Sequence, residues 1–192
     1  MDSLTGVVML MFLVCVLPSV IPFLVIDFVT GFGHWLEDTY GSEKTPFVGK
    51  LIIAPNVDHH RHPMAFTQTS FWSRNSLLVY AAAALLAVFW ACGILTLPWA
   101  AAIAMGAVTN EIHFYTHCRP CQLPRPIEWL QRLRILQTRH HHVVGHHQSP
   151  FDGAYCICLN VLNPLLDGIR FWRALEWLVL KAGGPAPRMA RA

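Results

Sequence analysis

Long apolar stretches alternate with shorter polar tracts along this chain. Residues 4–26 carry no charge, and neither does the stretch between Arg74 and Glu111. A helix needs about 20 apolar residues to cross a bilayer core of about 30 Å, so the first stretch is long enough for one crossing. The second is too long for one helix, and Pro98 interrupts it because proline removes a helical hydrogen bond. This pattern predicts a helical hairpin with arms near residues 76–96 and 98–118.

The first apolar stretch continues into the sequence DFVTGFGHWLED, and Pro18 and Pro22 interrupt it. We expect one long helix, kinked by the prolines, that ends near Glu37. The alternative is a hairpin that breaks near Pro18, whose first arm would be short for a crossing. The N-terminus lacks the basic start and small-residue cleavage site of a secretory signal, so we interpret it as a retained membrane segment.

The C-terminal third contains apolar pieces that are too short to span a membrane. FWRALEWLVL has an amphipathic pattern, with Arg170, Arg173 and Lys181 placed to reach lipid headgroups. This pattern is typical of a helix that lies in the membrane interface. We expect one domain over residues 1–188, followed by a disordered tail at 189–192.

The composition agrees with this pattern. Charged residues make up 13% of the 192 residues, about half the roughly 25% usual for soluble domains. The sequence therefore predicts an all-α integral membrane protein, a small bundle of about three to four spans. The formal charge of +3 and the lack of a basic run with interleaved aromatics argue against nucleic-acid binding. Cys118 and Cys121 form a lone CxxC, which is more typical of free thiols than of a metal site.

All 14 lysines and arginines fall in two tracts, residues 44–74 and 119–191. The predicted hairpin lies between these tracts and returns the chain to the side that it left. Every basic residue then lies on one face, which the positive-inside rule makes cytoplasmic, or stromal in an organelle. The 11 histidines follow the same logic, so we expect all of them on that face too.

The spacing of the histidines indicates a metal centre. His113 and His117 are four residues apart, so one helix face presents both rings. The last cluster, RHHHVVGHH, offers three more candidates with HxxxHH spacing. Eight or more imidazoles are thus available on one face, those of His34, His59, His60, His113, His117, His142, His146 and His147, with His140 and His141 in reserve. One zinc needs at most four ligands, so this number of imidazoles implies two metals, and imidazole suits iron, zinc, copper and nickel.

Other polar residues are candidates for supporting the ligands. Asp27, Gly31, His34 and Asp38 fall on one stripe of the first helix, and an aspartate in an apolar segment suggests a function. A carboxylate commonly holds the second nitrogen of a ligand imidazole. The candidates for this role are Asp27, Asp38, Asp58, Glu111 and His141. The zinc-protease motif HExxH does not occur.

Several motifs, in order, resemble the lipid desaturase domain family. They are HWLEDTYGSEKTPFVGK, DHHRHPMAFT, TNEIHFYTH, HHQSP, YCICLNVLNPLLD and FWRALE, and the resemblance covers residues 27–188. This family includes plasmanylethanolamine desaturase and the chloroplast palmitate Δ3-trans desaturase. The motifs TNEIH and FWRALE are nearer to the plasmalogen enzyme.

The resemblance implies a membrane-bound desaturase that holds two non-haem iron ions on the eight histidines. It further implies O2 as oxidant, a glycerophospholipid substrate, and electrons from cytochrome b5 or a ferredoxin-type protein. The leading expectation is formation of the vinyl-ether bond of plasmalogens. Alternatives are a Δ3-trans desaturase acting on phosphatidylglycerol, a hydroxylase with the same ligands, and a histidine-rich metal-binding or transport protein.

The chain departs from the family in its last histidine motif, which is HxxHH in relatives and HxxxHH here. A one-residue π-bulge near Gly145 would bring His142 back into line with the other two rings. In the alternative, His141 or His140 replaces His142 as a ligand. The N-terminal region is also shorter than expected, so one membrane segment is expected to be abbreviated or missing.

Overall fold

The computed structural model describes residues 3–148 and 151–188. In these ranges the chain forms helices joined by short loops and no β-sheet, and one isolated bridge pairs Leu136 with Leu159. The predicted all-α class is confirmed. Two helices, Thr5–Tyr40 and Phe71–Ala91, are long and apolar enough to cross a membrane, and Leu97–Ala107 is apolar but shorter. Length and composition therefore support two of the three to four expected spans.

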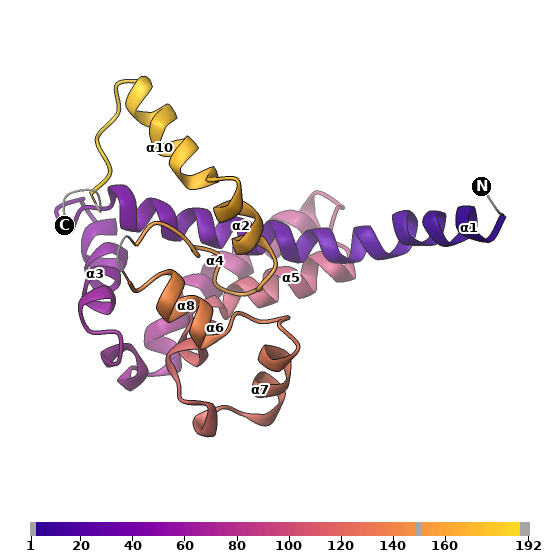
Figure 1. The fold of residues 1–192 in the computed structure, drawn as a ribbon, viewed down its shortest axis with the longest axis horizontal. Helices are drawn as coiled ribbons and strands as arrows, with labels where there is room; N and C mark the ends of the chain where they lie inside the picture. Colours follow the sequence, from indigo (N-terminus) through magenta and orange to yellow (C-terminus); the bar gives the residue numbers. More distant parts are fainter. Residues whose placement is uncertain (1–2, 149–150, 189–192) are drawn as a thin grey trace.

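One continuous helix forms the N-terminal arm. It runs from α1 (Ser3–Met11) through the π-helical segment η1 (Phe12–Val16) into α2 (Leu17–Tyr40). The hairpin near Pro18 is therefore wrong, and the single helix extends past Glu37. The wider π turn directly precedes Pro18, whose nitrogen has no hydrogen for the carbonyl one turn earlier. α1 projects beyond the other helices (Figure 1), and the apolar side chains from Val7 to Leu13 are exposed, as in a lipid-facing helix.

The predicted helical hairpin is present, with different bounds. Its first arm is α4 (Phe71–Ala91), which begins where the Ser70 hydroxyl accepts the Ser73 N–H at 3.2 Å. Gly93, at φ 70°, then turns the chain in the left-handed conformation that glycine adopts readily. α5 (Leu97–Ala107) returns along α4 and packs between α4 and α2. Ile26, Ala102 and Ile103 form the buried core of this bundle.

The return arm is broken at Val108, so the expected continuous helix at 98–118 is wrong. The Thr109 hydroxyl donates to the Gly106 carbonyl at 2.9 Å, a local bond that competes with the helical ladder. The new helix α6 (Thr109–His117) receives its cap from α4, because the Asn75 side-chain oxygen accepts the Glu111 N–H at 3.2 Å. The break re-aims α6 and both of its histidines.

The remaining helices are short. Before the hairpin lie η2 (Gly49–Ile53), α3 (Ala54–Arg61) and η3 (Ala65–Gln68), and after it η4 (Pro120–Gln122), α7 (Arg125–Arg132) and α8 (Arg139–Gly145). The chain ends with α9 (Leu162–Gly168) and α10 (Phe171–Lys181). α3 contacts α2, and α8 contacts α6, so segments far apart in sequence meet there (Figure 1).

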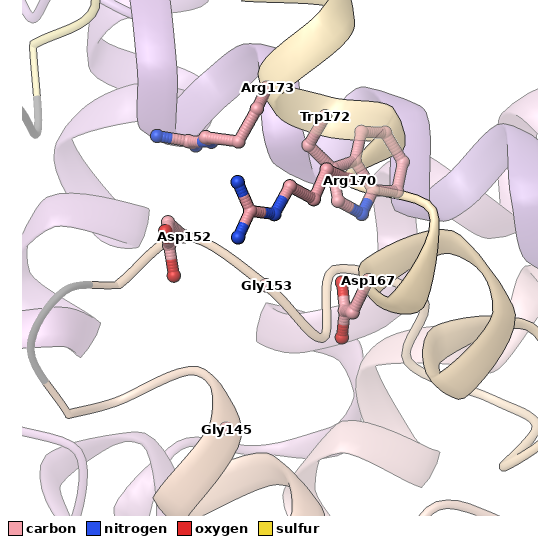
Figure 2. A pocket seen from close by; sticks show the side chains of 7 residues that line it. All are labelled: Gly145, Asp152, Gly153, Asp167, Arg170, Trp172 and Arg173. Atoms are coloured by element: carbon pink, nitrogen blue, oxygen red, sulfur yellow. The ribbon is translucent and has the colours of Figure 1, made fainter.

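The expected C-terminal helix is α10, and its two faces differ. Trp172 and Glu176 are buried, and Trp172 packs with Trp35 and Tyr155 in a second core. Trp177 and Leu178 are exposed on the other side. Its location at a membrane interface stays a prediction, and the tail at 189–192 lies outside the described residues. A cavity of about 450 Å³ opens beside α10, lined by residues of α9 and of the loop after α8 (Figure 2).

Candidate metal centre

Four helices and one loop bring the eight candidate histidines together. His34 and Asp38 are one turn apart on α2, His59 and His60 are adjacent on α3, and α6 carries His113 and His117. Of the last three, His142 lies on α8, and His146 and His147 lie in the loop directly after it. Six of the eight are buried, and His60 and His147 are half-buried, so the structure gathers all eight candidate histidines.

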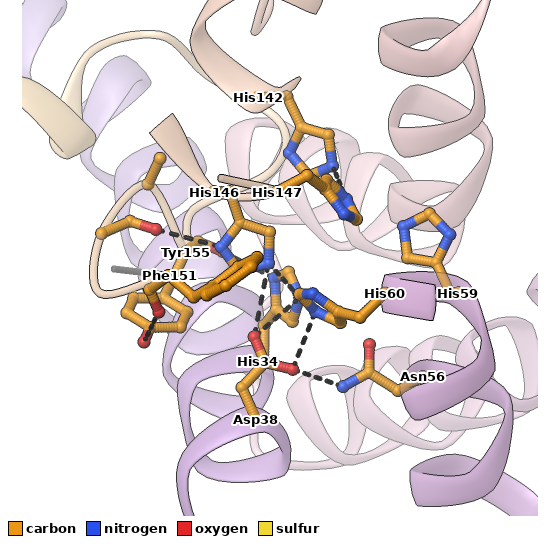
Figure 3. Close-up of polar contacts among 12 residues, drawn as sticks. His34, Asp38, Asn56, His59, His60, His142, His146, His147, Phe151 and Tyr155 are labelled. Atoms are coloured by element: carbon orange, nitrogen blue, oxygen red, sulfur yellow. Dashed lines mark hydrogen bonds and ion pairs between the residues drawn. The ribbon is translucent and has the colours of Figure 1, made fainter. Parts of the chain in front are cut away.

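The ligand atoms form two groups, and within each group they lie within 4.8 Å of one another. The five-histidine cluster consists of His59, His113, His117, His142 and His147. The mixed cluster consists of His34, Asp38, His60 and His146 (Figure 3). Nine donor groups in two sets match the expectation of two metals from the number of imidazoles.

Adjacent residues divide between the two clusters. His59 faces the five-histidine cluster and its neighbour His60 faces the mixed cluster, and His147 and His146 divide in the same way. Successive side chains on a helix point about 100° apart, so the neighbours on α3 suit two adjoining sites better than one compact site. His146 and His147 follow the end of α8 and divide in the irregular backbone there. The rings of His60 and His147 lie 4.8 Å apart between centroids, which places the clusters side by side.

The distances within the five-histidine cluster fit metal ligands. Successive Nε2 atoms are separated by 3.0 Å (His59 to His113), 3.1 Å (His113 to His117), 3.1 Å (His117 to His142) and 3.0 Å (His142 to His147). An imidazole nitrogen carries either one hydrogen or a lone pair, so it cannot both donate and accept, and these contacts cannot all be hydrogen bonds. Metal–nitrogen bonds of about 2.1 Å at right angles separate neighbouring nitrogens by about 3.0 Å, and tetrahedral angles by about 3.4 Å. These separations are compatible with metal ligands, and five donors exceed the four that a structural zinc site takes.

Backbone carbonyls orient two rings of the mixed cluster. The His34 Nδ1 lies 3.2 Å from the Tyr155 carbonyl oxygen, and the His146 Nδ1 lies 3.0 Å from that of Gly153. A carbonyl only accepts, so Nδ1 carries the hydrogen in both rings and Nε2 keeps its lone pair. The two Nε2 atoms lie 3.1 Å apart (Figure 3). Such partners on the second nitrogen are usual for metal-ligating histidines.

Asp38 supplies the carboxylate of the mixed cluster. Its Oδ2 lies 3.4 Å from the His34 Nε2 and 3.3 Å from the His146 Nε2, and its Oδ1 lies 3.1 Å from the His60 Nε2. The Asn56 side-chain amide donates to Oδ1 at 2.6 Å and fixes the orientation of the carboxylate. The buried Oδ2 has no hydrogen-bond donor among the described residues. A buried carboxylate oxygen without a donor indicates that a cation is its partner.

The protonation state of the rings suits metal binding. Burial, with neighbouring imidazoles, lowers the pKa of His59 to about 2 and holds that of His142 well below its ordinary value. Both rings are therefore neutral near pH 7, the form in which imidazole binds a metal. The Phe66 ring covers the five-histidine cluster, with its centroid 4.7 Å from that of His59 and 4.9 Å from that of His113. The donor set thus fits two transition-metal ions.

The extra residue of the HxxxHH motif is accommodated at the end of α8. His142 lies in the five-histidine cluster, whereas His140 is exposed and the His141 Nδ1 pairs with the Asn160 side-chain oxygen. No π-helical segment is assigned in α8, which ends at Gly145. At this end the His142 carbonyl accepts both the His146 N–H at 2.9 Å and the His147 N–H at 3.3 Å, and the second is a single bond of the π type, five residues apart. The last two histidines then diverge to different clusters.

Four of the five candidates for a supporting role lie elsewhere, and those expectations are corrected. The buried Asp27 accepts the Cys158 N–H at 2.9 Å and ties α2 to a loop. Asp58 faces solvent with His62, at 3.0 Å. Glu111 pairs with Arg74 at 2.6 Å, and His141 bonds to Asn160. Asp27, Glu111 and His141 tie ligand-bearing helices to other segments, and of the five candidates only Asp38 meets the rings.

Three contributors were missed at the sequence level. Asn56 is four residues before His60 on α3, so the helical repeat already placed the two on one face. Phe66 follows the histidine motif in HPMAF, with no spacing that marks it as a cover. The Gly153 and Tyr155 carbonyls belong to the backbone of an irregular loop, for which side-chain patterns carry no signal.

Comparisons with known proteins agree with this geometry. The chain is 34% identical over 182 residues to plasmanylethanolamine desaturase 1 of Mus musculus, a match that covers 86% of this chain and 65% of the relative. It is 32% identical over 176 residues to plasmanylethanolamine desaturase of Myxococcus xanthus, covering 86% and 60%. The chloroplastic fatty acid desaturase 4-like 2 of Arabidopsis thaliana is 30% identical over 175 residues, covering 86% and 60%.

The chain spans less than two thirds of the length of each of these relatives. No solved structure matches it. The lipid desaturase domain itself matches over residues 23–190, which includes all nine residues of the two clusters. This match covers most of the chain, and the chain belongs to the lipid desaturase domain family.

Proposed function

We propose that this protein is a membrane-bound di-iron lipid desaturase that forms the vinyl-ether double bond of a plasmanyl phospholipid. The observation that carries the proposal is the pair of adjoining clusters, which offers eight imidazoles and one carboxylate. Two relatives with the higher identities are named plasmanylethanolamine desaturase, which supports this substrate over the alternatives. Family membership likewise supports a desaturase over a metal transporter.

The reaction removes two hydrogens from neighbouring carbons of a saturated chain. With O2, two electrons and two protons, it yields the alkene and two waters, so an external electron donor is required. We propose a cytochrome b5 or ferredoxin-type protein for that role. Two iron ions, when bound, would supply the oxygen-dependent hydrogen abstraction that amino acid side chains cannot perform.

The chain's own residues hold and shield the centre. The Gly153 and Tyr155 carbonyls keep Nδ1 of His146 and His34 protonated and present Nε2 to the metal. Asn56 orients Asp38. Phe66 keeps water from two rings of the five-histidine cluster. The iron assignment rests on the five donors of that cluster, because structural zinc takes four tetrahedral ligands.

Expression in cells that lack plasmalogens tests this function. We expect vinyl-ether lipids to appear in the lipid extract, and a variant with Asp38→Ala to produce none. If trans-Δ3 acyl chains of phosphatidylglycerol appear instead, the substrate is the alternative one. Hydroxylated lipid without any alkene would show a hydroxylase.

A further inference from the structure

The cavity beside α10 contains charges of both signs. Arg170 and Arg173 extend their guanidinium groups into it, and Asp152 and Asp167 lie on its other side (Figure 2). Its volume of about 450 Å³ lies within the roughly 300–1,000 Å³ range of small-molecule sites. Two cationic and two anionic side chains in one cavity match a ligand that carries both charges.

The arginines have donors that the protein does not use. Among the described residues, the Arg170 guanidinium has no carboxylate within ion-pair distance. Arg173 pairs with Glu176, whose carboxylate also accepts the Trp35 indole N–H at 3.3 Å. This anchor holds Arg173 in place, and its buried Nε has no partner in the described part of the chain. One guanidinium group can donate two parallel hydrogen bonds to two phosphate oxygens, so the two arginines suit a phosphate group.

The two carboxylates of the cavity differ in their hydrogen bonding to the protein. Asp167 accepts the Ala154 N–H, with its two oxygens 3.1 and 3.3 Å from that nitrogen. Asp152 is half-buried and lines the cavity opposite Arg170. An ammonium group beside Asp152 would complete a charge pattern of phosphate at one end and amine at the other.

The cavity adjoins the mixed cluster, and the helices that line it carry exposed apolar side chains. Gly153 lines it, and the Gly153 carbonyl accepts the hydrogen of the His146 Nδ1 at 3.0 Å. On the outside, Leu165 and Ile169 of the α9 region and Trp177 of α10 are exposed. An amphipathic ligand meets both needs, because its charged end enters the cavity and its chains lie on the apolar surface.

We propose that this cavity binds the phosphoethanolamine headgroup of the lipid substrate, with Arg170 and Arg173 on the phosphate and Asp152 on the ammonium. The proposal rests on the desaturase function proposed above. The carbons of a plasmanyl lipid that become the vinyl-ether double bond are only a few bonds from the glycerol phosphate. Gly153 lines the headgroup site and its carbonyl contacts His146, so a bound headgroup would place the reacting carbons next to the metal centre.

Titration calorimetry tests the proposal, with dihexanoyl phosphatidylethanolamine added to the metal-loaded full chain in detergent. Arg170→Gln should weaken binding by about tenfold or more, as expected for the loss of charge-assisted hydrogen bonds, and should leave the metal content unchanged. Asp152→Asn should weaken binding of this lipid but not of the phosphatidylglycerol analogue. Arg132→Gln, an exposed arginine on α7, is the matched control and should bind like the wild type.

The activity assay separates this proposal from the proposed function. Arg170→Gln should raise KM and leave kcat near the wild-type value. Wild-type affinity and KM in that variant would overturn the headgroup site, and so would inorganic phosphate binding as tightly as the lipid. If the wild type binds the lipid through Arg170 but forms no alkene, the proposed function fails and the headgroup site stands.

Discussion

Two pairs of adjacent histidines point into different clusters, and this explains how one short chain builds two adjoining sites. His59 with His60, and His146 with His147, each contribute one ring to either side. The His113 and His117 pair, one turn apart, contributes both rings to a single cluster. A spacing of one residue thus separates two sites, and a spacing of four concentrates ligands in one.

The sequence left open whether His142, or His141 or His140 in its place, is the first ligand of the last histidine motif. We predict that His142→Gln loses about one metal per chain, because its ring lies among four other donors. His140→Gln, two residues away and exposed, should keep the wild-type metal content. Metal analysis of both purified variants checks this. Full metal content in the His142 variant would contradict its place as a ligand.

The lowered pKa of His59 and His142 predicts acid sensitivity of the metal-free protein. In the unfolded chain these rings take up protons below about pH 6.5, whereas in the folded chain they stay neutral. Stability is therefore complete above pH 6.5 and falls as the pH falls towards about 2, where His59 becomes charged in the folded state.

Thermal unfolding of the metal-free protein in detergent at pH 7.5 and pH 5.5 measures this effect. His142→Gln should narrow the difference in Tm between the two pH values, and His140→Gln should leave it as in the wild type. Equal Tm values for the wild type at both pH values would refute the prediction.

At the scale of elements, α2 organises the site through one stripe. Asp27, Gly31, His34 and Asp38 recur at helical spacing, as the sequence indicated, and each meets a different part of the centre. Asp27 holds the Cys158 N–H, and Gly31 lies against Cys156. The stripe therefore docks the loop at 153–158, whose carbonyls orient His34 and His146.

Gly31→Ala tests this docking. An added Cβ would lie 2.7 Å from the Cys156 Sγ and 2.9 Å from its Cα, so the loop must shift. We expect a loss of about 1–3 kcal/mol in the free energy of unfolding, with weaker metal retention in the mixed cluster. Gly33→Ala is the control, because nothing lies within 4 Å of its added Cβ. Denaturation and metal analysis of both variants compare them, and equal stability would contradict the account.

The helical spacing of residues predicted most of the fold and of the site. The features that were not predicted depend on irregular backbone and on contacts between distant segments. Spacing together with the family's motifs identified the eight histidines, and spacing identified Asp38 and the hairpin around Pro98. It did not foresee the break at Val108, because that break depends on Asn75 of another helix capping α6. It also assigned Asp27 to an imidazole, since a stripe shows which face a residue occupies but not what lies opposite.

At the scale of the whole molecule, the two basic tracts predict one orientation in the membrane. Cys92, in the turn between α4 and α5, and Cys121, in the second tract, are exposed free thiols on opposite sides of that scheme. An impermeant maleimide should label Cys92 only from outside the cell and Cys121 only from the cytoplasmic face.

Two variants make this labelling specific. Replacing Cys15 and Cys121 by serine leaves Cys92 as the exposed thiol, and replacing Cys15 and Cys92 leaves Cys121. Detergent-solubilised protein is the control in which both should react. Labelling of both thiols from the same side of sealed membranes would overturn the predicted hairpin topology.

The number and kind of metal ions in the purified protein test the central claim most directly. The two clusters and the donor set of each predict about two irons per chain in detergent-purified protein, measured by elemental analysis against protein concentration. The Asp38→Ala variant should hold fewer than the wild type. Iron near zero, with stoichiometric zinc or no metal in its place, would contradict the di-iron centre.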